Sequence, residues 1–261
     1  MTSAQDWNAP AYHRVSDPQF AWGQAVLARL RLSGDEHVVD AGCGTGRLTK
    51  ELAARVPRGV LVGLDASKQM LAQARAHLAA ESTRIHLVET LLPAMPIANW
   101  ADVVFSTATF HWVRDHPALF ANILLALKPG GRVSAQCGGG ANLAKARAPV
   151  RDTFRRVPFA RWFADWTPIW EFADDRQTAT RLAAAGFTDI ETSLESAPVR
   201  FEDEQTYRAF VTTVVFRLHL AKLPEELRGP FLDEIIARLP KGPDTLTLDY
   251  WRLNISARRP E

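Results

Sequence analysis

A strand-like segment that runs into three alternating glycines constrains the fold of this chain more than any other feature. Val38 and Val39 are aliphatic residues typical of a buried strand, and Asp40 stands at the end of that strand. The glycines follow at every second position: Gly42, Gly44 and Gly46. Glycine permits a sharp backbone turn and leaves no Cβ where a ligand must touch the main chain. We therefore predict a strand, a tight turn and a helix over residues 47–55, with a ligand at the turn.

The residue after the third glycine argues against two common phosphate-binding loops. A Walker loop would continue Gly-Lys-Ser/Thr, but the run here continues Gly46-Arg47-Leu48. The dinucleotide fingerprint requires Gly or Ala at position 47, where Arg47 stands. The turn is therefore expected to hold a ligand without a pyrophosphate, which disfavours NAD.

Asp65 ends the next predicted strand, residues 59–64, and an acid at this position can accept hydrogen bonds from both hydroxyls of a ribose. An Asp before a helix is also a common N-cap, and Ser67 is a further N-cap candidate for the helix predicted over residues 68–79. Asp40 has two interpretations of equal weight, since it can bind a ligand or the amides of the turn itself. Together, the glycine turn and Asp65 indicate a ligand that carries a nucleoside.

Strand-like and helix-like segments alternate from about residue 36 to residue 136. Strands are predicted at residues 37–40, 59–64, 84–88, 101–106 and 132–136, with helices at 47–55, 68–79 and 115–127. This alternation predicts an α/β fold with a doubly wound, mostly parallel sheet. Ligands of such sheets bind beyond the carboxyl ends of the strands, where Asp40, Asp65 and residues 106–112 all fall.

Composition narrows the class of protein. The chain has 261 residues, 47% hydrophobic and 23% charged, with a net charge of +2, so we expect no nucleic-acid partner. No apolar run is long enough for a membrane span, and residues 1–10 lack the apolar core of a secretory signal. The two cysteines, Cys43 and Cys137, are expected to be free thiols in a reducing compartment, which predicts a cytoplasmic protein. Oligomeric state is left open.

Several segments resemble the motifs of class I S-adenosylmethionine-dependent methyltransferases. These segments are residues 38–46, Asp65, Ser67 with Met70 and Leu71, and residues 127–131. Others are similar to signatures of the trans-aconitate 2-methyltransferase-like branch: Trp7-Asn8 with Tyr12, residues 106–112 with Asp115-His116, and residues 249–259. The resemblance spans almost the whole chain and implies a Rossmann-like fold, S-adenosyl-L-methionine as the cofactor and methyl transfer as the activity.

The same resemblance organises the rest of the chain. We expect an N-terminal lid and first helix in residues 1–32 and a cofactor-binding core in residues 33–137. A helical substrate cap is expected in residues 138–186 and 203–243. Strands in residues 187–202 and 244–261 are expected to complete the sheet, the last of them antiparallel.

Cofactor-binding roles follow from the resemblance alone. It implies that Gly42, Gly44 and Gly46 approach the methionine part of the cofactor, that Asp65 binds the ribose, and that Ser67 and Met70 lie near the adenosine. The family carries an acid for the adenine amino group at the position of Leu91, so Glu89 or the backbone would have to replace it. Trp7 and Tyr12 are expected either to close over the cofactor or simply to dock the terminus onto the core.

The substrate side rests on fewer signals. His111 follows the fourth strand and is either a general base or a packed histidine, since its free pKa lies near neutrality. Trp112 beside it is expected to wall the site. Trp162 and Trp166 would either roof an apolar acceptor or form the core of the cap. No cluster of His, Cys or Asp has metal-ligand spacing, so no metal is expected.

The resemblance implies direct displacement of the methyl group by an acceptor atom. Together with the lack of a clear base, it favours a carboxylate of a trans-aconitate-like acid as the acceptor. A carboxylate is ionised at neutral pH and needs no base, whereas a phenol or carbon acid would need one, with His111 as the candidate. The alternative acceptor is an aromatic or lipid-like secondary metabolite methylated on O, C or N. An alternative of another class is a regulatory protein that binds S-adenosylmethionine without catalysis.

Overall fold

The computed structural model describes residue 9, residues 17–81 and residues 83–261. Trp7 and Tyr12, the two aromatic residues expected in the lid, lie outside these ranges. Among the described residues, no helix is both long enough and apolar enough to cross a membrane.

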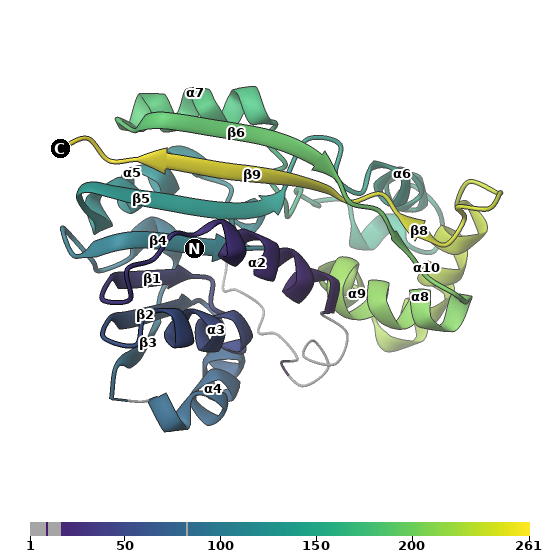
Figure 1. The fold of residues 1–261 in the computed structure, drawn as a ribbon. Helices are drawn as coiled ribbons and strands as arrows, with labels where there is room; N and C mark the ends of the chain where they lie inside the picture. Colours follow the sequence, from purple (N-terminus) through teal and green to yellow (C-terminus); the bar gives the residue numbers. More distant parts are fainter. Residues whose placement is uncertain (1–8, 10–16, 82) are drawn as a thin grey trace. The chain divides into compact units, whose positions relative to one another are not determined.

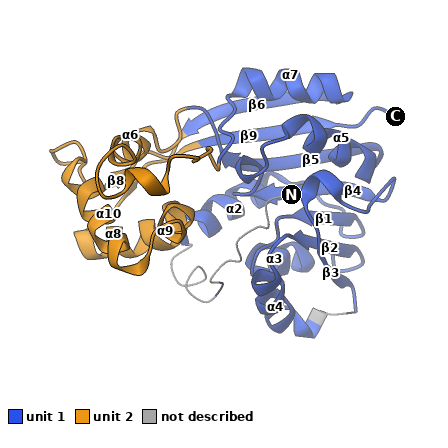
Figure 2. Cartoon of the chain, turned by 180° about the vertical axis from the view of Figure 1, so that it is seen from behind, with its two compact units in different colours: residues 1–140, 170–195, 252–261 blue, residues 141–169, 196–251 orange. Residues whose placement is uncertain are grey.

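The chain divides into two compact units (Figure 2). The first contains residues 1–140, 170–195 and 252–261, and the second contains residues 141–169 and 196–251. Residues 170–186, which we expected in the helical cap, therefore belong to the first unit. The physical reason is burial, because Leu182 and Phe187 are part of the hydrophobic core that packs on the sheet.

The first unit is built on a seven-stranded sheet in the order β3-β2-β1-β4-β5-β9-β6 (Figure 1). The strands are β1 (His37–Ala41), β2 (Val60–Asp65), β3 (Ile85–Glu89), β4 (Ala101–Thr107), β5 (Leu127–Gly138), β6 (Thr188–Ser196) and β9 (Trp251–Arg258). The first five pair in parallel, and β9 runs antiparallel to β5. The predicted mostly parallel sheet with a C-terminal antiparallel strand is confirmed.

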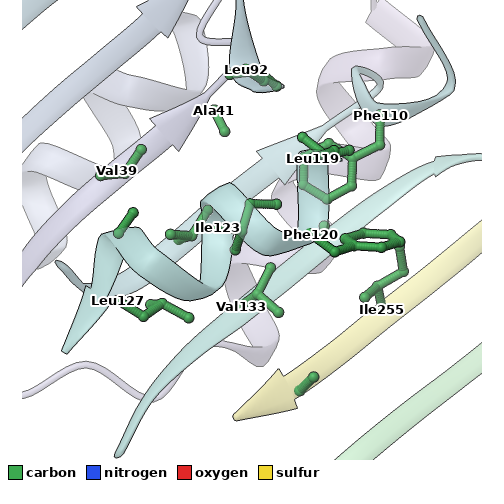
Figure 3. Close-up of a cluster of buried hydrophobic side chains, with 14 of the residues drawn as sticks. Val39, Ala41, Leu92, Phe110, Leu119, Phe120, Ile123, Leu127, Val133 and Ile255 are labelled. Carbon is green, nitrogen blue, oxygen red and sulfur yellow. The ribbon is translucent and has the colours of Figure 1, made fainter. Parts of the chain in front are cut away.

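Helices of the first unit cover both faces of this sheet. They are α2 (Asp17–Arg29), α3 (Arg47–Arg55), α4 (Lys68–His77), α5 (His116–Ala126) and α7 (Asp175–Ala185). Neighbouring residues of β1 point to opposite faces. Val38 joins a core with Leu27 of α2 and Leu52 of α3. Val39 joins the core formed with α5, which Figure 3 shows around Phe120.

The second unit is mainly helical. It contains α6 (Ala144–Thr153), α8 (Glu204–Phe210), a π-helical turn (Val211–Val215), α9 (Arg217–Ala221), α10 (Glu225–Ala237) and the short pair β7 (Val199–Arg200) and β8 (Thr247–Leu248). Its interior is aromatic: Phe154 and Phe231 stack on Phe163 with ring centroids 4.1 and 5.4 Å away. Pro149 lies inside α6 and does not divide it.

Candidate active site

The glycine turn between β1 and α3 adopts the conformation that its composition predicts. Gly42, Gly44 and Gly46 have φ values of 87°, 54° and 81°, in the left-handed region that favours glycine. A Cβ at Gly42 would lie 2.1 Å from Oγ1 of Thr109, and a Cβ at Gly46 would lie 2.9 Å from Leu78. A Cβ at Gly44 would have no atom within 4 Å. The main chain at Gly44 is therefore accessible to a ligand.

A pocket opens beside this turn, between α2 and the end of β4. Its lining includes Gln19 and Phe20 of α2, Asp40 of β1, Gly42 and Gly44 of the turn, and Thr107 of β4. The structure thus brings three of the predicted cofactor residues to one pocket. The contribution of α2 was not predicted, because α2 precedes the turn by a long stretch of chain and carries no recognisable motif.

Asp40 lines this pocket and is buried, with 2% of its surface exposed. Its Oδ2 accepts a hydrogen bond of 2.7 Å from the hydroxyl of Thr49, in α3. Burial raises the pKa of Asp40 to about 7, opposed by the Thr49 bond and assisted by the negative charge of Asp65. Asp40 therefore braces the helix after the turn through Thr49, and its role toward a ligand stays a prediction.

Asp65 ties the glycine turn to the end of β2. Its Oδ2 accepts a hydrogen bond of 2.9 Å from the amide of Gly44, and its Oδ1 accepts one of 2.8 Å from the amide of Ser67. Ser67 is the N-cap of α4, as predicted, since its hydroxyl accepts the amide hydrogen of Met70 at 3.2 Å. Both Ser67 and Met70 are buried. Asp65 therefore holds the glycine turn in position. The same carboxylate is the group predicted to bind the ribose, and that role stays a prediction.

Glu89 and Leu91 lie at and just beyond the end of β3. Glu89 is the register partner of Asp65 in the neighbouring strand, so the two side chains share one edge of the sheet. Its carboxylate pairs with Lys68 at 3.9 Å, and both groups are exposed. Leu91 is 52% exposed, an unusual state for a large apolar side chain. Glu89, two positions before Leu91, thus places an acid close to Asp65, the residue predicted to bind the ribose.

His111 lies in the short 3-10 turn Phe110–Trp112 that follows β4. Its Nδ1 accepts a hydrogen bond of 3.3 Å from the amide of Gly138, at the end of β5. The ring stacks on Phe172 at 5.7 Å. Burial lowers the pKa of His111 well below its usual range, helped by the positive charge of Arg252 and by His116. The ring is therefore neutral at neutral pH, and with Nδ1 as acceptor its hydrogen sits on Nε2.

Trp112 is half-buried beside His111, in the first unit. Its ring lies 5.3 Å from the ring of His111 and 5.8 Å from that of Trp170. Sequence reasoning did not assign Trp170 or Phe172 to this group. The signal for them in the sequence is that residues 159–172 are rich in aromatic side chains.

Trp162 and Trp166 belong to the second unit. The ring of Trp166 packs on His219 at 4.6 Å and on Phe154 at 5.6 Å. The ring of Trp162 is covered by the guanidinium of Arg161 at 5.0 Å. The contacts of Trp166 fit the core-packing interpretation, and the roles of Trp162 and Trp166 toward a substrate stay predictions.

Within residues 17–81 and 83–261, no three His, Cys, Asp or Glu side chains are grouped so that they could hold a metal ion. The two cysteines are free thiols, and both are buried.

Comparison with known proteins shows the family to which this chain belongs. A family model described as a methyltransferase domain matches residues 38–131. The chain is 30% identical to trans-aconitate 2-methyltransferase of Methylobacterium nodulans, over 97% of this chain and 98% of that protein. It is 35% identical to the Acidovorax ebreus protein of the same name, over 50% of this chain. That match covers 49% of the Acidovorax protein, about half the length of this relative.

Solved structures agree on the fold. Phosphoethanolamine N-methyltransferase 2 of Haemonchus contortus, in complex with S-adenosyl-L-methionine, superposes with a TM-score of 0.65 at 20% identity. The superposition covers 100% of this chain and 58% of that chain. The methyltransferase-domain match and the full-length relative define an S-adenosylmethionine-dependent methyltransferase, and the fold is that of class I. Within that class, the chain belongs to the family whose members are named trans-aconitate 2-methyltransferase.

Proposed function

We propose that this protein transfers the methyl group of S-adenosyl-L-methionine to a carboxylate oxygen of a small organic acid. Membership of the family supports methyl transfer and the identity of the cofactor. The observation that supports a carboxylate as the acceptor is the hydrogen bond from Gly138 to Nδ1 of His111.

The residues around the glycine turn fit the cofactor. S-adenosyl-L-methionine, when bound, supplies a methyl group on a positively charged sulfur. Gly44 leaves its main chain open to the methionine part, and Asp40 provides a carboxylate in the same pocket. Asp65 and Glu89 stand at the ends of the next two strands, where they would hold the ribose and the adenine.

His111 is unsuited to act as a base in the arrangement observed. A neutral imidazole has one acceptor nitrogen, and in His111 that nitrogen already accepts the amide hydrogen of Gly138. The other nitrogen, Nε2, carries a hydrogen and donates. A carboxylate acceptor is ionised at neutral pH, so it needs no proton removed and can accept that hydrogen bond. Transfer then unites a carboxylate with a cationic methyl donor, and the loss of charge favours a site that excludes water.

A substrate panel combined with two His111 variants tests this proposal. Small carboxylic acids, trans-aconitate among them, and phenols are compared by release of S-adenosylhomocysteine. We expect turnover of acids, and a loss of about 10–100-fold in kcat/KM for His111→Ala, the usual range for a hydrogen bond to a charged group. His111→Gln retains an N–H donor and is expected to recover much of that loss.

The pH profile separates a donor from a base. A neutral donor gives His111→Ala the same loss at about pH 6 and at about pH 9. If wild-type turnover instead rises with the ionisation of one group and His111→Ala abolishes that rise, His111 is the base and the acceptor is not a carboxylate.

Two other functions are outcomes of the same panel. The aromatic interior of the second unit is the observation that favours an aromatic or lipid-like acceptor, and turnover of phenols alone would establish it. Binding of the cofactor without turnover of any acceptor would indicate a regulatory protein. We further propose a small-molecule acceptor rather than nucleic acid or membrane, and a reducing, cytoplasmic setting that fits two unpaired thiols.

A further inference from the structure

Gln19 carries a buried polar atom for which the protein supplies no partner. The residue lies in the first turn of α2, is 8% exposed and lines the pocket beside the glycine turn. Its Oε1 is buried and accepts no hydrogen bond from any part of the chain that the structure describes. Most buried amide oxygens in proteins are paired, so an unpaired one in a ligand pocket points to a partner on the ligand.

The position of Gln19 is held from several sides. Asp17, two residues earlier, accepts hydrogen bonds from the guanidinium of Arg47 at 3.1 and 3.2 Å. The same guanidinium lies over the ring of Phe20, 4.1 Å from its centroid. One turn later, α2 packs on α3 so closely that a Cβ at Gly23 would lie 2.2 Å from Leu48. Gln19 is thus fixed beside the glycine turn by its neighbours on the helix.

The turn itself offers few donors to a ligand. The amides of Gly42 and Cys43 donate to the carbonyl of Leu64, at 2.8 and 2.9 Å. The amide of Gly44 donates to Asp65, and that of Gly46 donates to the carbonyl of Cys43. These amide hydrogens are therefore engaged within the protein, unlike those of a loop that binds phosphate.

Acceptors, in contrast, face the pocket from two elements. They are Oε1 of Gln19, from α2, and the carboxylate of Asp40, from the end of β1. Arg47 also lines the pocket, but its guanidinium donates to Asp17 and lies over the ring of Phe20. The two acceptors suit a group that donates hydrogen bonds and carries positive charge, such as a primary ammonium.

We propose that Oε1 of Gln19 accepts a hydrogen bond from the α-ammonium group of the cofactor's methionine part. Gln19 is then a cofactor-binding residue that discriminates in favour of ligands with this ammonium. The inference rests on the proposed function only for the identity of the cofactor, and it holds whichever acceptor is methylated.

Binding measurements with two ligands test this role without turnover. The probes are S-adenosylhomocysteine and its analogue that lacks only the α-amino group, each titrated calorimetrically into wild type, Gln19→Leu and Gln19→Glu. Gln205→Leu is the matched control, because Gln205 is exposed in α8 of the second unit. We expect Gln19→Leu to weaken S-adenosylhomocysteine by about 10–100-fold and to leave the deamino analogue within about twofold. Gln19→Glu, which keeps an acceptor, is expected to bind S-adenosylhomocysteine at least about tenfold more tightly than Gln19→Leu.

Several results would overturn the proposal. An equal loss for both ligands in Gln19→Leu means that the residue supports the pocket and does not bind the ammonium. A Gln19→Glu variant that binds more weakly than Gln19→Leu means that the amide donates to an anionic group. Both results leave wild-type affinity for S-adenosylhomocysteine intact, whereas a wild type that binds neither ligand overturns the cofactor assignment as well. Thermal unfolding of each variant shows whether the fold is preserved.

Discussion

Replacing Asp40 by Asn alters a buried acid whose ionisation opposes folding. Burial raises the pKa of Asp40 to about 7 in the folded protein, against an ordinary value of 3.8. Between these values the folded state holds a proton that the unfolded state has released. The free energy of unfolding therefore falls as pH rises from about 4 to about 7, and it stays low above that range. An asparagine side chain does not titrate, so the Asp40→Asn variant escapes this loss.

The size of the effect follows from the pKa. From about pH 5 to the folded pKa spans two pH units, each worth about 1.4 kcal/mol, so wild type loses about 3 kcal/mol of stability between about pH 5 and about pH 8. Asparagine retains an oxygen that can accept the hydroxyl of Thr49, which keeps the brace to α3. We expect the stability of Asp40→Asn relative to wild type to improve by about 3 kcal/mol over this pH range.

Urea unfolding of both proteins at the two pH values measures this difference. Asp102→Asn is the control: burial alone would raise the pKa of Asp102, but hydrogen bonds from Lys128 and His37 lower it below 3.8. Its contribution to stability is lost only as pH falls through that lowered pKa, so the effect of Asp102→Asn is the same at about pH 5 and pH 8. A difference between Asp40→Asn and wild type that does not change with pH refutes the reasoning.

Three further predictions concern the glycine turn and the residues that hold it. Gly42→Ala is expected to destabilise the protein by about 2 kcal/mol or more in urea unfolding, because its Cβ would collide with Thr109. Gly44→Ala is expected to lower the free energy of unfolding by only about 1 kcal/mol, because its Cβ meets no atom and only the positive φ is unfavourable. Gly44→Ala is nonetheless expected to weaken S-adenosylhomocysteine in calorimetry, since its methyl group enters the space open to the ligand; unchanged affinity would place the ligand elsewhere. Asp65→Asn loses a charged acceptor for the amides of Gly44 and Ser67, so we expect about 2 kcal/mol of destabilisation and at least about tenfold weaker binding, with Glu195→Gln as an exposed control.

Local patterns in the sequence were sufficient for the central part of the fold. A strand, a glycine turn and a helix are contiguous in the chain, so the positions of Asp40, Gly42, Gly44 and Gly46 could be read from residue type and spacing alone. The acid at the end of the next strand and the cap at Ser67 are local in the same sense. The π-helical turn at Val211–Val215 lies within residues 203–243, which were expected only to be helical, since hydrophobic periodicity does not distinguish an α-helix from a π-helix.

The sequence by itself determined the class of the fold, the family and the conformation of the glycine turn, because these depend on backbone conformations that particular residue types permit. Only the tertiary structure decided what surrounds that turn. It placed Gln19 in the pocket, assigned residues 170–186 to the first unit, and engaged Nδ1 of His111 with the amide of Gly138. These contacts join segments far apart in the chain, and periodicity carries no information about which distant elements pack together. The tautomer of His111, and with it the expected chemistry of the acceptor, follows from one such contact.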